Sequence, residues 1–128
     1  MRILVINTNA SEVVTDKVRS VAEAAKRKDC ELTVEGLSRG PFTLASSSDD
    51  AYAIEPTIDR VRKANSENYD AIVLACFCDI GVEAAREISS IPVLGLEETT
   101  LSVALMLGAK FSIMTEKRPR VAMKERHI

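Results

Sequence analysis

Short apolar runs alternate with stretches of helical periodicity along this chain. Apolar residues recur every three or four positions between the runs, which predicts helices at residues 14–25, 54–61, 82–88 and 101–105. The runs themselves predict strands at residues 3–6, 31–37, 71–75 and 91–95. Such alternation is typical of a parallel sheet covered on both faces. We therefore predict an α/β fold, a three-layer αβα sandwich with a mostly parallel sheet.

The last part of the chain has a different pattern. Residues 111–115 form another apolar run that ends in a polar residue, as residues 3–7 do, and they predict a fifth strand. A charged tail at 116–128 follows and can form one more helix, although Val121 and Met123 are too few to define a buried face. We predict an α/β domain at 1–110, with 111–128 as the start of a second repeat, or a swapped strand, plus a tail helix. A mere extra strand at 111–115 is an equally open interpretation.

Composition narrows the class of protein. A chain of 128 residues with 46% hydrophobic and 28% charged residues fits one globular domain. The net charge of -2 and the few aromatic residues disfavour a nucleic-acid partner. No apolar run reaches the roughly 18 residues of a membrane span, or resembles a signal peptide, so we expect a cytoplasmic protein without a membrane partner. Three cysteines, an odd number, then indicate free thiols.

Cys76 is the principal candidate for chemistry, because it follows a strand and precedes a predicted helix. The carboxyl ends of parallel strands form the crevice where α/β sheets bind ligands. The amides of a following helix favour a thiolate, so we expect Cys76 to ionise and to be alkylated before Cys30. Cys30 precedes a strand and should lie at the opposite end of the sheet. A buried core cysteine is the alternative interpretation of Cys76.

Other polar residues follow strands at the same rim, and each has a simpler alternative. Asn7 and Asn9 can present amides to a ligand, or can be ordinary turn residues. Glu97 can bind a ligand, or can stand in the first turn of a helix because of the helix dipole. Thr115 can bind a substrate oxygen, or can be a strand-end hydroxyl, and Asp79 is most simply a helix N-cap.

The cysteine pair and the arginine pair of the tail do not predict a metal or an anion site. Cys78 shares a strand face with Cys76, but a structural zinc site needs four ligands and His127 is the one histidine, so we expect no metal. A Cys-His hydrolase is disfavoured for the same lack of a histidine near Cys76. Arg118 and Arg120 are expected on a solvated surface.

Several segments together resemble the hydantoin racemase family, within the aspartate and glutamate racemase superfamily. Arg2 to Ser11 is similar to that family's Asn-Pro-Asn-Thr-Ser start, and Ala75-Cys-Phe-Cys-Asp-Ile-Gly81 is similar to its Ala-Cys-Phe-Gly-Asp-Pro-Gly segment. Residues 92–98 and 111–115 continue the match in order and spacing. The sequence departs from the pattern at Thr8, where the family has proline, and at Cys78, where it has glycine.

The resemblance implies the flavodoxin-like half of the racemase fold and cofactor-independent racemisation of hydantoins or related amino-acid derivatives. In that family two cysteines, one from each half, face opposite sides of an acidic carbon, and Cys76 matches the first of them. The implied substrate-binding residues are Asn7, Asn9, Phe77, Cys78, Glu97 and Thr115.

The family's second cysteine segment is not found in this chain, which stops where a second half would begin. We therefore expect self-association, in which two copies present Cys76 to one small-molecule substrate. The alternative is a small-ligand-binding or vestigial half-domain without turnover.

Overall fold

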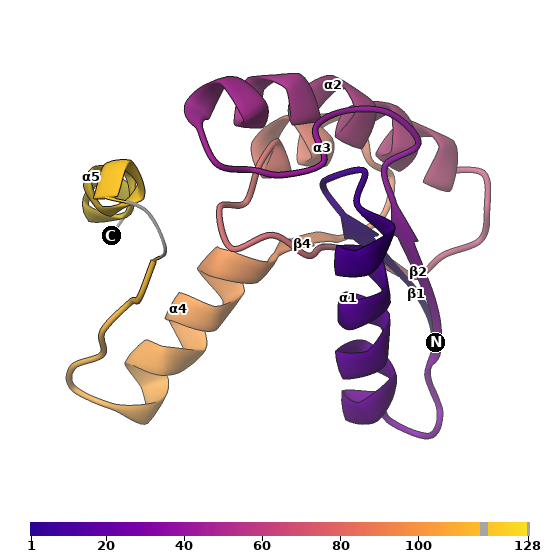
Figure 1. The fold of residues 1–128 in the computed structure, drawn as a ribbon. Helices are drawn as coiled ribbons and strands as arrows, with labels where there is room; N and C mark the ends of the chain where they lie inside the picture. The colour runs from indigo at the N-terminus through magenta and orange to yellow at the C-terminus, as the bar shows by residue number, and fades with distance from the viewer. Residues whose placement is uncertain (116–117, 128) are drawn as a thin grey trace.

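The computed structural model describes residues 1–115 and 118–127. It confirms the predicted alternation of strands and helices (Figure 1). In chain order the elements are β1 (Arg2–Asn7), α1 (Glu12–Ala25), β2 (Glu31–Gly36), α2 (Ser47–Ala64), β3 (Ala71–Leu74), α3 (Val82–Ile88), β4 (Val93–Gly95), α4 (Leu96–Leu107) and α5 (Arg118–His127).

The four strands form one parallel sheet in the order β2-β1-β3-β4. From β1 the chain passes to β2 on one side and then returns to β3 on the other. Ile6 of β1 pairs with Leu74 of β3, so the carboxyl ends of these two central strands lie next to each other. This is the switch point of the sheet, where open α/β folds bind their ligands.

The two faces of the sheet are covered by different helices. Leu4 and Ile6 of β1 and Leu74 of β3 are fully buried in one cluster with apolar residues of α2 and α3. Side chains alternate along a strand, so Val5 and its register partner Val34 point to the other face. That face is covered over β1 and β2 by α1. The sandwich prediction is therefore confirmed.

Helix α2 begins earlier than the apolar periodicity suggests. The polar run from Ser46 to Asp49, which precedes the predicted helix at 54–61, forms the N-cap and first turn of this helix. The Asp49 backbone N–H donates to Ser46 Oγ at 3.2 Å, and Asp49 Oδ2 accepts from the Ser46 N–H at 2.9 Å. Such a capping box satisfies two amide groups that a helix start would otherwise leave unpaired.

The predicted fifth strand is wrong. Residues 111–115 have no strand pairing in the described part of the chain, where the sheet ends at β4. A strand needs a neighbour, and an apolar run alone does not supply one. The tail helix does form, as α5, while Glu116, Lys117, Ile128 and the His127 side chain lie outside what the structure describes.

Asp79 caps a helix, but not the adjacent one. The residue before α3 is Gly81, and Asp79 instead accepts hydrogen bonds from the backbone N–H groups of Glu97 and Glu98 at 2.8 and 2.7 Å. Its carboxylate thus satisfies the first turn of α4, where the helix dipole favours a negative charge. Gly95 makes room for it, because a Cβ atom there would lie 2.5 Å from the carboxylate.

We predict that Gly95→Ala lowers the free energy of unfolding by about 1–3 kcal/mol, since the carboxylate or the helix start must move. Gly108→Ala is the matched control, because its added Cβ would meet its nearest atom, the Lys110 carbonyl oxygen, at 3.5 Å. That variant should leave the stability unchanged or raise it by up to about 1 kcal/mol. Urea titration followed by circular dichroism measures both, and equal stabilities of the two variants would contradict this account.

Candidate functional site

A cavity of about 510 Å³ opens at the switch point of the sheet. The loops that follow β1, β2 and β3 line it, together with the segment after α4 and one face of α5. The lining includes Asn7, Asn9, Phe42, Leu44, Cys76, Phe77, Cys78, Met114, Thr115, Arg120 and Lys124. Cys76 lies two residues beyond the last residue of β3, as the sequence predicts, and it is only partly buried.

Asn7 and Asn9 build a rigid turn at one wall of the cavity. Asn7 Nδ2 donates to Asn9 Oδ1 and to Thr15 Oγ1, both at 2.9 Å. Asn9 Oδ1 also accepts from the Ser11 N–H at 2.9 Å. The turn interpretation is therefore correct for both asparagines. Since it uses the Oδ1 atom of Asn9, the Nδ2 group of that side chain is the one left for a ligand.

Cys76 and Cys78 are in contact and titrate together. The hydrogen bond to Cys78, burial and the negative charge of Cys78 raise the pKa of Cys76 far above the usual thiol range, although Thr8 and the Cys78 N–H oppose this. The hydrogen bond from Cys76 and the charges of Lys124 and Arg120 lower the pKa of Cys78 to about 6. These contacts favour the thiolate on Cys78, whereas the sequence predicts it on Cys76.

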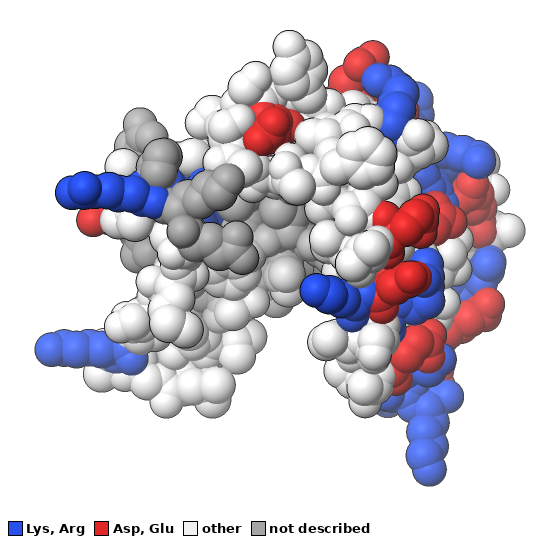
Figure 2. Space-filling view, viewed as in Figure 1, with Lys and Arg blue, Asp and Glu red and all other residues white. Residues whose placement is uncertain are grey.

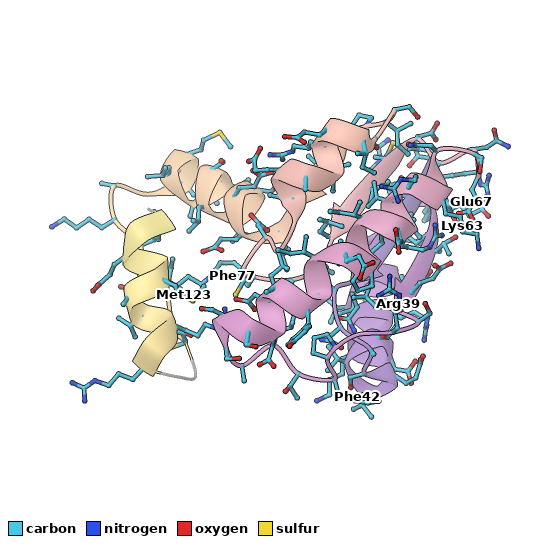
Figure 3. All side chains as sticks on the ribbon, turned by 90° about the horizontal axis from the view of Figure 1, so that it is seen from above. Arg39, Phe42, Lys63, Glu67, Phe77 and Met123 are labelled. Carbon is cyan, nitrogen blue, oxygen red and sulfur yellow. The ribbon has the colours of Figure 1, made fainter. Side chains whose placement is uncertain are left out.

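Lys124 of α5 reaches across to the cysteine loop. Its ammonium donates to the Phe77 carbonyl oxygen and to Cys78 Sγ, the latter at 3.7 Å. It also pairs with Glu97 Oε2 at 2.6 Å, and it lies 5.0 Å from the centre of the Phe77 ring. Lys124 is 7% exposed, so these contacts occur out of bulk water and are strong. In Figure 3, Phe77 lies beside α5 on the side that faces the rest of the molecule.

Arg120 fixes the other end of the same helix face. Its guanidinium binds both carboxylate oxygens of Asp50 on α2, at 2.6 and 2.8 Å, and donates to the Leu44 carbonyl oxygen at 2.9 Å. Arg120 is 5% exposed, so its predicted place on a solvated surface is wrong, whereas Arg118 is exposed as predicted. Paired, planar contacts of this kind hold a helix in one orientation.

Of the other residues considered from the sequence, some line the cavity and others do not. Phe77 and Thr115 line the cavity beside Cys76. Glu97 is 3% exposed and lies outside the cavity lining, where it pairs with Lys124. Cys30 lies just before β2, at the opposite end of the sheet from Cys76.

Sequence reasoning missed Thr8, Arg120 and Lys124. The Thr8 hydroxyl is buried without a conventional hydrogen-bond partner in the described residues, yet it lowers the pKa of Cys76. Arg120 and Lys124 are four residues apart, which places them on one helix face, and this spacing was the available signal.

Within residues 1–115 and 118–127, no helix has the length and apolar character needed to cross a bilayer. The same residues contain no cluster of three or more His, Cys, Asp or Glu side chains suited to hold a metal ion.

Comparison with known proteins identifies the family and the fold. The family model for Asp/Glu/Hydantoin racemase matches residues 3–128. The hydantoin racemase of Pseudomonas sp. (strain NS671) is 36% identical over 115 residues, which are 90% of this chain and 46% of that protein. The hydantoin racemase of Paenarthrobacter aurescens is 37% identical over 116 residues, which are 90% of this chain and 49% of that protein. The chain thus spans about half the length of these relatives.

A solved structure gives the same result. The allantoin racemase from Klebsiella pneumoniae superposes with a TM-score of 0.93 at 31% identity, over 99% of this chain and 51% of that one. The resemblance first seen in the cysteine segment is confirmed by the family model, the sequences and the fold. The chain belongs to the Asp/Glu/hydantoin racemase family.

Proposed function

We propose that this chain supplies one face of a cofactor-independent racemase site for 5-substituted hydantoins or related cyclic ureides and amino-acid derivatives. Cys76 is the catalytic acid and base on that face. As a base, its sulfur takes the proton from the acidic ring carbon and leaves an enolate. As an acid, it returns a proton to the same carbon. The observation that carries this proposal is the position of Cys76 in a cavity at the switch point.

The surroundings of Cys76 support a transient negative charge on its sulfur. The Thr8 hydroxyl and the Cys78 backbone N–H both act to lower the pKa of this thiol. Such donors stabilise a thiolate once the proton has left. A group that holds its proton at rest and loses it only during turnover can serve in both directions of a reversible proton transfer.

Substrate contacts come from the cavity wall. Asn9 and Thr115 offer polar groups for the ring amide and carbonyl groups, while Phe77 and Cys78 lie beside the reacting sulfur. Asn7 acts by holding Asn9. Glu97 acts through Lys124 rather than on the substrate.

Inversion requires an acid on the opposite face of the ring carbon. Cys78 cannot be that acid, because it touches Cys76 and two groups in contact cannot flank one carbon. We propose that a second copy of the chain completes the site. In support, α4 exposes Leu105, Met106 and Leu107 at 66, 77 and 83%. The outer surface of this helix carries few charged side chains (Figure 2), and such apolar surfaces are typical of interfaces.

The first test is exchange of the C5 proton of an enantiopure 5-alkylhydantoin in heavy water, followed by NMR. Cys76→Ser should lower the exchange rate by about 100-fold or more, since the base is lost. Cys30→Ser removes a thiol at the far end of the sheet and should leave the rate unchanged. No exchange by the unaltered chain on any hydantoin would favour ligand binding without turnover.

The second test concerns the partner surface. Sedimentation velocity should show a monomer–dimer equilibrium that Met106→Glu shifts to monomer, because a charge would be buried in the interface. Val21→Glu is the matched control, since Val21 of α1 is similarly exposed at 70%. The dimer should racemise the hydantoin, whereas the Met106→Glu monomer should exchange its C5 proton with retention of configuration. Racemisation by a monomer would overturn the shared-site proposal.

A further inference from the structure

The Lys124 ammonium is a buried cation with three acceptors around it. They are the Glu97 carboxylate, the Phe77 carbonyl oxygen and Cys78 Sγ, and an ammonium group has three protons to donate. The first two acceptors hold α5 against α4 and against the loop after β3. The third is a sulfur atom of the cavity wall, 3.7 Å from the nitrogen.

Charged groups reach Cys78 from each element packed on it. Helix α5 contributes Lys124 and Arg120, both positive, and α2 contributes Asp50, which is negative and bound to Arg120. Its own loop contributes the thiol of Cys76. Two carboxylates lie near these cations, Asp50 bound to Arg120 and Glu97 of α4 bound to Lys124, but only Lys124 directly contacts the sulfur, and this contact favours a negative charge on Cys78.

We propose that Cys78, stabilised as a thiolate by the Lys124 ammonium, exchanges a proton with Cys76. Cys78 rests as a thiolate against the Lys124 ammonium and accepts the Cys76 proton when Cys76 acts as a base. Cys78 and Lys124 are positioning residues in this scheme, because the substrate proton moves only to and from Cys76.

The proton transfers balance without an oxidant or cofactor. The S–H bond of Cys76 breaks, an S–H bond forms on Cys78, and the negative charge moves to Cys76. The Cys78 thiol, the Cys78 backbone N–H and the Thr8 hydroxyl are then available to stabilise that charge. The Cys76 thiolate next takes the C5 proton of the substrate. Reversal of these steps restores the resting pair, so the cycle is catalytic in both directions.

The catalytic role of this proton exchange rests on the proposed function. The charge states of Cys76 and Cys78 are tested without any substrate. Alkylation of each cysteine in the reduced chain by iodoacetamide, followed by peptide mass spectrometry from pH 5 to pH 10, gives a midpoint for each thiol that ionises within that range. Cys78 should react with a midpoint near 6, as its thiolate forms above that pH. Cys76 should react only at much higher pH.

Two variants separate an electrostatic role of Lys124 from a structural one. Lys124→Met should raise the Cys78 midpoint by about one pH unit or more, since the cation is lost. Glu97→Gln should lower it or leave it in place, because the Lys124 charge is no longer shared. A merely structural clamp would make both variants shift the midpoint in the same direction. Lys28→Met, on an exposed loop, is the control and should change nothing.

A further variant tests whether Cys76 and Cys78 share one proton. Cys78→Ser removes the neighbouring negative charge, so Cys76, unreactive in the unaltered chain up to pH 10, should be alkylated at lower pH in this variant. Equal reactivity of Cys76 in the two chains, or alkylation of Cys76 at lower pH than Cys78 in the unaltered chain, would overturn the proposal. Because these readouts need no turnover, a chain that fails to exchange the C5 proton refutes the proposed function and leaves this result standing.

Discussion

One carboxylate, that of Asp79, connects the elements on which the site depends. It accepts hydrogen bonds from the first turn of α4, and the side chain of Glu97 in that turn pairs with Lys124. Lys124 then contacts Cys78, the residue directly before Asp79. This circuit of contacts therefore begins and ends in the loop that holds Cys78 and Asp79. The loop, α4 and α5 are positioned by polar contacts, which are directional, whereas apolar packing alone would tolerate several arrangements. Gly95 permits the circuit, since any side chain there would occupy the space of the carboxylate.

The sequence predicts those parts of the fold that depend on neighbouring residues in the chain, and fails where a distant segment decides the structure. The apolar runs at 3–6 and 71–75 lie in the two central strands, where Leu4, Ile6, Ile72 and Leu74 are fully buried and their neighbours are at least partly buried. The place of Cys76 follows from the strand before it. Residues 111–115 are just as apolar, but a strand also requires a pairing partner, and pairing is not encoded in the run itself. The same pattern therefore predicts two strands correctly and a third wrongly.

The sequence does not predict that Arg120 and Lys124 of α5 line the cavity, and the cause differs from that at 111–115. A tail with few apolar residues predicts a solvated helix, because burial is ordinarily apolar. Arg120 and Lys124 are nevertheless buried, since each meets a carboxylate from a distant segment; Asp50 is 70 residues from Arg120. Whether a charged side chain is solvated or buried depends on such a partner. Helical spacing places the two cations on one face but does not identify what that face meets.

Thr8 and Cys78 are two of the positions at which the sequence departs from the family motifs that it resembles, and both act on Cys76. They act on its pKa in opposite directions, Thr8 lowering it and Cys78 raising it. A proline or glycine at these positions has no side-chain group that could do either. The second thiol therefore does not duplicate the chemistry of the first. Because the two sulfur atoms are in contact, they share one charge and one side of the cavity. A pair of this kind controls when Cys76 holds its proton, and the opposite face of the substrate still requires a group from outside this half of the fold.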